Sequence, residues 1–238
     1  MRRQEGPFTT VLSPSPRPAG CSIATGMYAS AKICGLATPG TLDAAVAGGA
    51  SHVGFVFFEA SPRNVGFEQA AGLAARVPDH VQRVGVFVDP DDALLEAAVK
   101  AGRLDAVQLH KTAPERAAAI RDRFGRQTWA AVAVKTRADL DAARSYVGAA
   151  DRILYDAKTP PGAALPGGMG LRFDWTLLDG FAHPLPWALS GGLDAGNVGE
   201  AIKRTGVRLV DVSSGVEEAP GVKDVAKIAA FLAAVARG

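Results

Sequence analysis

Four side chains that can take part in chemistry stand within or at the end of short apolar runs: Cys34, Gln108, His110 and Asp156. A thiol can serve as a nucleophile or a base, but a lone cysteine in a strand is more often inert core. Asp156 could cap a turn, Gln108 could bond the backbone, and His110 could be a solvated strand end. Each residue by itself favours a structural role, so a functional role requires that the fold bring them together.

Three glycine-containing segments follow later apolar runs: GGMG (167–170), SGGL (190–193) and SSG (213–215). Glycine lets the backbone come close to a ligand, so that successive N–H groups can point at phosphate oxygens. The alternative is that these glycines only end strands and start helices, which is common in a chain with 27 glycines. Neither SGGL nor SSGVE contains a lysine, so we expect backbone amides to supply most of the attraction for a phosphate.

The segment SPRN (61–64) contains a further candidate, Arg63. A loop that includes proline restricts the backbone beside this arginine, and a planar guanidinium can bind a carboxylate through two hydrogen bonds. An exposed surface arginine is the alternative, and this segment alone does not decide between the two.

From residue 31 onward, short apolar runs alternate with alanine-rich segments whose apolar residues lie three or four positions apart. This alternation predicts parallel strands joined by helical crossovers. The eight predicted strands cover 31–36, 52–57, 83–88, 105–110, 129–134, 152–156, 186–190 and 208–213. The eight predicted helices cover 39–49, 67–77, 91–101, 113–124, 137–147, 174–180, 194–204 and 223–236.

Two α/β architectures fit such a series of units: an open doubly wound sheet and a closed eight-stranded barrel. The length of residues 31–238 lies near the lower end of the range for a barrel. No GxGxxG segment links the first strand to the first helix, as a dinucleotide-binding sheet would require. We therefore predict a single (β/α)8 TIM barrel that forms one domain over residues 31–238.

The alternation of side chains along a strand predicts which of them point into this barrel. Ile33 is apolar and should face the helices, which turns Lys32 and Cys34 inward. Polar groups inside a barrel cost stability unless they are used, and barrel enzymes place their chemistry at the carboxyl ends of the strands. The same alternation directs inward a polar set from the fourth, sixth and eighth strands, namely Gln108, His110, Asp156, Asp211 and Ser213.

Composition limits the partners of this chain. Its 26 basic and 24 acidic residues are interspersed and leave a net charge of +2, which gives no basis for binding nucleic acid. No apolar stretch approaches the length of about 18 residues that a membrane span needs. Two cysteines, Cys21 and Cys34, are too few for a disulfide framework, which favours the reduced cytoplasm. The four histidines show no metal-ligand spacing, and a monomer is favoured, although the sequence leaves the oligomeric state open.

Residues 1–30 differ from the rest of the chain. They are rich in proline and arginine, show no apolar periodicity, and lack the apolar core of a secretory signal. An organellar transit peptide is one alternative, although its helix would be disfavoured by the prolines. We favour a disordered extension ahead of the domain, with Met27 near the start of the folded part.

Taken together, the motifs of residues 31–238 resemble the phosphoribosylanthranilate isomerase family. Single motifs such as SGGL are common in proteins, whereas the combination of all these motifs in this order is highly specific. The matching words are KICGL (32–36), GFVFFEASPRNV (54–65), VGVFVD (84–89), AVQLHK (106–111), YDAKTP (155–160), GGMGLRFDW (167–175), LSGGL (189–193), NV (197–198) and VDVSSGVEEAPGVKD (210–224).

The resemblance implies an Amadori rearrangement of N-(5-phosphoribosyl)anthranilate in tryptophan biosynthesis, with a phosphosugar as the only partner and no metal or organic cofactor. It implies that Cys34 is the general base, that Asp156 is the general acid, and that Arg63 holds the carboxylate of the substrate. Lys32, on the strand face of Cys34, could favour the thiolate. The implied phosphate-binding residues are Gly168, Gly170, Gly191, Gly192, Ser213, Ser214 and Gly215, with Gln108, His110 and Asp211 as supporting polar groups.

Two residues depart from the pattern of this family. Met169 stands where serine or threonine is usual, and Lys111 replaces a common glycine after QLH. Other phosphosugar barrels are alternatives, but the metal ligands of an epimerase and the catalytic lysine and glutamates of an indole-glycerol-phosphate synthase are not visible. A catalytically silent phosphosugar-binding barrel is a third alternative, although binding alone would need neither Cys34 nor Asp156.

Overall fold

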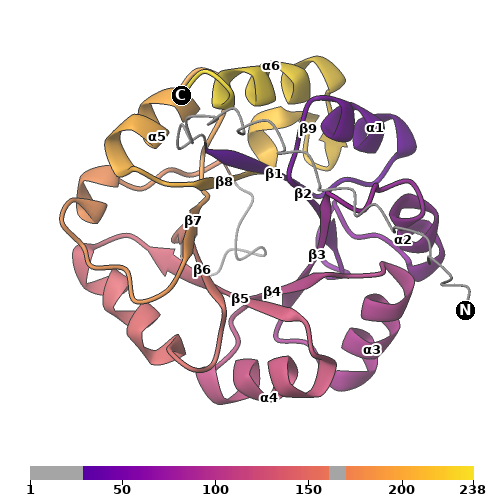
Figure 1. Cartoon of the computed structure of the whole chain (residues 1–238), viewed down its shortest axis with the longest axis horizontal. Helices are drawn as coiled ribbons and strands as arrows, with labels where there is room; N and C mark the ends of the chain where they lie inside the picture. The colour runs from indigo at the N-terminus through magenta and orange to yellow at the C-terminus, as the bar shows by residue number, and fades with distance from the viewer. Residues whose placement is uncertain (1–28, 161–169) are drawn as a thin grey trace, which may run out of the picture.

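The chain folds into a closed barrel of eight parallel strands, and this confirms the predicted architecture (Figure 1). The computed structural model describes residues 29–160 and 170–238, so the predictions for residues 1–28, Gly168 and Met169 lie outside the described part. Strand β8 pairs with β1, which closes the ring. The strands are β1 (Ser30–Cys34), β2 (His52–Val56), β3 (Gln82–Val88), β4 (Ala106–His110), β5 (Gln127–Val134), β6 (Arg152–Ala157), β7 (Trp187–Leu189) and β8 (Leu209–Val212).

Helices form an outer layer around the strands, as the alternating pattern predicts (Figure 1). Several of them begin at a side chain that satisfies a free N–H group, such as Asp91, which accepts from the Leu94 N–H at 2.8 Å. The α-helices are α1 (Pro39–Ala47), α2 (Phe67–Ala74), α3 (Asp92–Ala101), α4 (Pro114–Phe124), α5 (Val198–Thr205) and α6 (Val225–Val235). The 3₁₀ helices are η1 (Arg137–Tyr146), η2 (Trp175–Leu178) and η3 (Ser214–Val216).

The structure differs from the predicted helices in three places. The segments predicted as helices at 137–147 and 174–180 are 3₁₀ helices, η1 and η2. The helix predicted from residue 194 begins only at Val198, because the Asp194 side chain accepts from the N–H groups of Gly196 and Asn197 and forms a turn. A short antiparallel hairpin, β9 (Glu217–Ala219) and β10 (Val222–Lys223), was not predicted.

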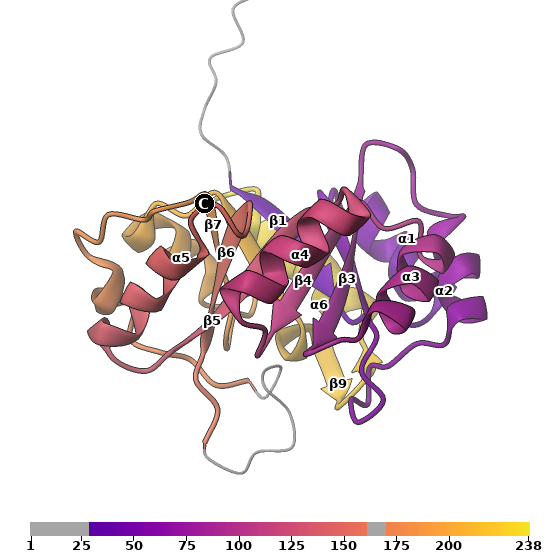
Figure 2. The same ribbon diagram turned by 90° about the horizontal axis from the view of Figure 1, so that it is seen from below.

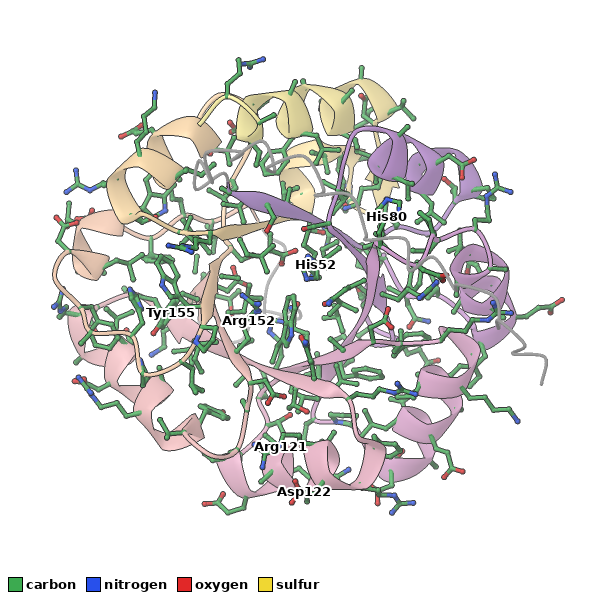
Figure 3. The ribbon with its side chains drawn as sticks, viewed as in Figure 1. His52, His80, Arg121, Asp122, Arg152 and Tyr155 are labelled. Carbon is green, nitrogen blue, oxygen red and sulfur yellow. The ribbon has the colours of Figure 1, made fainter. Side chains whose placement is uncertain are left out.

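Side chains fill the interior of the barrel. One buried apolar cluster takes one residue from each strand from β3 to β8: Val84, Ala106, Trp129, Leu154, Ala188 and Leu209. His52 and Arg152 lie inside the ring of strands and contact Trp129, with ring centroids 5.3 Å apart for His52 and the guanidinium 5.0 Å from the ring for Arg152 (Figure 3). A smaller cluster of Cys34, Val56 and Val86 lies toward the carboxyl ends of the strands. The barrel is therefore a packed core whose polar mouth lies at one end.

The β9–β10 hairpin lies at the end of the barrel to which the strand arrows point (Figure 2). Gly221 makes its turn with a φ of +84°, and an added Cβ there would lie 2.5 Å from the Pro62 carbonyl oxygen. The hairpin thus packs directly on the loop after β2. Within the described ranges, no helix combines the length and apolar character needed to cross a membrane.

Candidate active site

A pocket opens at the carboxyl ends of the strands and is lined by residues of every strand except β5 or of the loops that follow them. Lys32 and Gly215 do not line it, although both belong to the predicted site, and Gly168 lies outside the described residues. The predicted site residues that line it are Cys34, Arg63, Gln108, His110, Asp156, Gly170, Gly191, Gly192, Asp211, Ser213 and Ser214.

Cys34 ends strand β1 and is 6% exposed, at the floor of the pocket. Its neighbour across the sheet is Gly54, where a Cβ would lie 3.0 Å from Sγ, so the glycine makes room for the thiol. Burial raises the pKa of the Cys34 thiol, the Lys32 ammonium lowers it, and the net pKa is raised. The predicted influence of Lys32 on the thiolate thus has the expected direction but is outweighed by desolvation.

Asp211, which lines the pocket, and Lys32, which does not, form a buried ion pair with 2.8 Å between Nζ and Oδ1. Burial acts to lower the pKa of Lys32, but the charge of Asp211 and the neighbouring Cys34 outweigh it, so the pKa is raised. Ser190 donates to the other Asp211 oxygen at 3.4 Å. Lys32 is fully buried and acts on the pocket through its charge.

Asp156 stands near the end of β6, with its side chain in the pocket. Burial and then the negative charge of Asp211 raise the pKa of Asp156 to about 7. The Ala157 N–H donates to Oδ1 at 2.9 Å. Gly191 has a φ of +90° and packs so closely that a Cβ would lie 3.0 Å from this oxygen. The carboxyl is therefore held in a dry place and keeps its proton up to near-neutral pH.

Gln108 and His110 face inward from β4, as the strand alternation predicts, and their Nε2 atoms lie 3.0 Å apart. Burial and then the charge of Lys32 lower the pKa of His110 to about 4, so its ring is neutral at neutral pH. Among the described residues, Gln108 Oε1 is buried without a hydrogen-bond partner. After this strand, Lys111 has a φ of +53°, a backbone conformation that favours glycine and explains why glycine is common there.

Arg63 is buried rather than exposed, which excludes the alternative of a surface arginine. Its Nε and Nη2 donate to the two carboxylate oxygens of Glu217, at 2.7 Å each. Its side chain passes over Gly35, whose φ is +75° and where a Cβ would lie 2.8 Å from Cδ of the arginine. The guanidinium thus reaches the pocket from a rigid support.

Glu217 and Lys223 are charged residues near the mouth that sequence reasoning missed. Lys223 donates to Glu217 Oε1 at 2.6 Å and to the carbonyl and hydroxyl oxygens of Ser213 at 3.0 and 3.1 Å. Neither SGGL nor SSGVE contains a lysine, but this ammonium reaches Ser213 from ten residues further along the chain; that backbone amides supply most of the attraction for a phosphate stays a prediction. The sequence signal that could have found them is the dipeptide Pro220-Gly221, which is typical of a tight turn, with opposite charges on either side of it.

The glycine loops after β7 and β8 pack against each other and against Gly170. An added Cβ at Gly192 would lie 3.0 Å from the Gly170 carbonyl oxygen, and one at Gly215 would lie 1.9 Å from the Leu193 carbonyl oxygen. Gly170 and Gly192 both have positive φ, at +71° and +60°. These contacts are possible only without side chains, so the glycines bring three backbone segments together beside the pocket.

No group of three or more His, Cys, Asp or Glu side chains is placed to hold a metal ion within residues 29–160 and 170–238. The thiol and the carboxyl at this mouth can exchange protons with a bound molecule, and the arginine and the backbone amides can bind anions.

The family model and the most similar curated relatives that match this chain agree on one family. A family model described as N-(5'phosphoribosyl)anthranilate (PRA) isomerase matches residues 31–234. N-(5'-phosphoribosyl)anthranilate isomerases from Zymomonas mobilis subsp. pomaceae and Rhodospirillum centenum are 57% and 56% identical to the chain, and each match covers 88% of this chain and 99% of the relative.

Solved structures agree with this. The crystal structure of phosphoribosyl anthranilate isomerase from Thermotoga maritima superposes with a TM-score of 0.76 at 35% identity, covering 87% of this chain and 98% of that one. A phosphoribosyl anthranilate isomerase in complex with reduced 1-(o-carboxyphenylamino)-1-deoxyribulose 5-phosphate gives a TM-score of 0.74 at 33% identity, with the same coverage.

Proposed function

The chain belongs to the N-(5'-phosphoribosyl)anthranilate isomerase family, and we propose that Cys34 and Asp156 are the base and the acid of its reaction. The reaction converts N-(5-phosphoribosyl)anthranilate to 1-(2-carboxyphenylamino)-1-deoxyribulose 5-phosphate, a step of tryptophan biosynthesis. It is an Amadori rearrangement, in which an aminoaldose becomes an aminoketose by ring opening and proton transfers. The observation that carries the proposal is that both side chains line one pocket, with the pKa of Asp156 raised to about 7.

The first step opens the ribose ring. The nitrogen lone pair forms a double bond to C1 while the bond between C1 and the ring oxygen breaks, and the leaving oxygen needs a proton. Asp156 can donate that proton because its burial keeps the carboxyl neutral up to about pH 7. An exposed aspartate, ionised above about pH 4, would be unable to do so at neutral pH.

The second step removes the proton from C2. The iminium formed at C1 makes this proton acidic, and the Cys34 thiolate accepts it. The resulting enolamine then takes a proton at C1 and releases the proton of its C2 hydroxyl to water, which leaves the ketone. Burial raises the pKa of this thiol. The positive charge of the iminium lies beside it during the reaction, and together with the Lys32 ammonium it favours the thiolate.

The two anionic ends of the substrate have separate sites in this proposal. Arg63 holds the anthranilate carboxylate through its planar guanidinium. The 5-phosphate lies at the other side of the pocket, where glycines leave backbone N–H groups accessible. Gln108 and His110, with one unpartnered amide oxygen and a neutral ring, are placed to bind sugar hydroxyls. The proposed phosphate-binding residues are Gly168, Gly170, Gly191, Gly192, Ser213, Ser214 and Gly215.

The test is a fluorescence assay of N-(5-phosphoribosyl)anthranilate consumption, with chelator present, for Cys34→Ser and Asp156→Asn. Loss of a general acid or base should lower kcat by about 100-fold or more, with KM changed only a few-fold. Asp43→Asn, on the outer helix α1, removes an exposed carboxylate far from the pocket and should leave kcat unchanged. Wild-type turnover in either pocket variant would remove that residue from its proposed role.

We further propose that the enzyme works as a monomer in the cytoplasm. The proposed acid, base and carboxylate-binding side chains line one pocket of the barrel, an arrangement that needs no residue from a second copy, and Cys34 must stay a free thiol to act as a base. Light scattering at the concentration of the activity assay checks the first part of this proposal, since activity confined to a dimer fraction would contradict it.

A further inference from the structure

The charge of Arg63 is already neutralised within the protein. Its guanidinium donates two hydrogen bonds to the Glu217 carboxylate, and both side chains are almost fully buried, at 6% and 3% exposed. A buried bidentate pair of this kind carries no net charge. Arg63 and Glu217 alone would therefore offer little electrostatic attraction to a second carboxylate, which is the anion that Arg63 is proposed to bind.

A second cation joins this pair. Lys223 places Nζ 2.6 Å from Glu217 Oε1, the oxygen that also accepts from Arg63 Nε, and its side chain is 2% exposed. Burial lowers the pKa of Lys223, and the Glu217 carboxylate opposes that change. The ammonium does not line the pocket itself. It is fixed by the β9–β10 hairpin and by two hydrogen bonds to Ser213.

We propose that Lys223 is a positioning residue that restores a net positive charge to the Arg63–Glu217 pair, and thereby lets Arg63 bind the substrate carboxylate. Two cations share one carboxylate, so the triad keeps a charge of one, held in a place where water screens it little. Arg63 presents that charge to the pocket, and Lys223 acts through Glu217 without touching the substrate. This inference rests on the proposed role of Arg63.

The test measures the equilibrium binding of two non-reacting ligands by the full chain. One is reduced 1-(o-carboxyphenylamino)-1-deoxyribulose 5-phosphate, and the other is the same compound without its ring carboxyl group. Lys223→Met should weaken binding of the carboxylate-bearing ligand by about tenfold or more. Binding of the ligand without the carboxylate should change by less than about threefold, because it does not meet Arg63. The loss of the Lys223 hydrogen bonds to Ser213, a proposed phosphate-binding residue, would weaken both ligands equally and so does not account for a difference between them.

A double variant separates charge from support. Lys223→Met/Glu217→Gln leaves Arg63 as the single charge of the triad, so the net charge returns to one and binding of the carboxylate-bearing ligand should recover to within about threefold of wild type. A merely structural role for Lys223 predicts the reverse, since losing both partners would loosen the hairpin further. Binding weaker in the double variant than in Lys223→Met would overturn the proposal, as would an equal loss for both ligands in Lys223→Met.

Lys227→Met is the matched control. Lys227 lies on α6 and donates to the Glu217 carbonyl oxygen at 2.6 Å, so the variant removes an equal charge that contacts the same hairpin without touching the carboxylate. Binding of both ligands should stay within about threefold of wild type. If Lys223→Met does not fold, Glu217→Gln alone decides, because two cations without their anion should bind the carboxylate-bearing ligand at least as tightly as wild type. Failure of every protein, wild type included, to bind either ligand would instead reject the proposed function.

Discussion

Replacing Asp156 with asparagine should stabilise the fold, and the gain should grow with pH. In the folded protein the pKa of Asp156 is raised to about 7 by burial and by Asp211, whereas an unfolded chain ionises it at about 3.9. Below pH 3.9 the carboxyl is protonated in both the folded and the unfolded chain, so it does not lower the stability of the fold. As the pH rises toward 7, the unfolded chain ionises freely while the folded chain cannot, so stability is lost. Asparagine keeps the Oδ1 atom that accepts from the Ala157 N–H and has no charge to bury.

The size of the effect follows from the two pKa values. Their difference corresponds to about 4 kcal/mol when the titration is complete. Most of this difference develops between pH 5 and pH 8, so the free energy of unfolding of Asp156→Asn, relative to wild type, should be higher at pH 8 than at pH 5 by about 2 to 3 kcal/mol. Asp156 is only 7% exposed, so solvent screens the effect little.

The measurement is urea unfolding of wild type and variant at the two pH values. Asp139→Asn is a control of opposite sign. Burial acts to raise the pKa of Asp139, but the N–H groups of Thr136 and Lys135 outweigh it, so the pKa is lowered. The Asp139 carboxyl is ionised in both the folded and the unfolded protein at pH 5 and at pH 8. The effect of Asp139→Asn on the free energy of unfolding should therefore be the same at the two pH values. An Asp156→Asn gain that is the same at both pH values would refute the reasoning, because the carboxyl would then be ionised in the folded protein at neutral pH.

Two further predictions concern the backbone. Lys111→Gly should raise the free energy of unfolding by about 1 kcal/mol, since the φ of +53° strains a residue with a Cβ; a loss of stability in urea unfolding would show that the lysine side chain matters more. Gly215→Ala should disrupt the contact with the Leu193 carbonyl oxygen, 1.9 Å from the added Cβ, and cost about 2 kcal/mol or more. Gly199→Ala, with open space around it on α5, should be neutral or stabilising in the same assay.

The barrel and the inward faces of its strands could be predicted from the sequence because both depend on local patterns. Ile33 packs among the helix-facing core, and Cys34 lines the pocket, as the alternation along β1 requires. The same holds for Leu109 and His110 on β4. Once the strands and their order are known, parallel pairing places all their carboxyl ends at one mouth.

The support of Arg63 could not be predicted, because it depends on contacts between distant segments. Arg63 and Glu217 are 154 residues apart in the chain. The hairpin that carries Glu217 has strands of three and two residues, too short to show a period of two. The positions of charged residues in the sequence predict neither that Glu217 pairs with Arg63 nor that this pair is buried.

The balance of forces on the Cys34 thiol also lay beyond the sequence. Lys32 two residues away predicts a lower pKa, and its charge does act in that direction. The depth of burial decides the sign, and burial depends on how Gly54, Val56 and Val86 pack around the sulfur. The composition and spacing of the sequence do not show how deeply the Cys34 sulfur is buried.

The most direct test of acid catalysis by Asp156 is the ratio of kcat/KM for wild type to that for Asp156→Asn, measured from pH 5 to pH 9. Ionisation of the substrate and of Cys34 affects both enzymes and cancels in this ratio. We predict a constant ratio below pH 7 and a decline of tenfold per pH unit above about pH 7, as the wild-type carboxyl loses its proton. A ratio that stays constant to pH 9 would contradict the proposed acid.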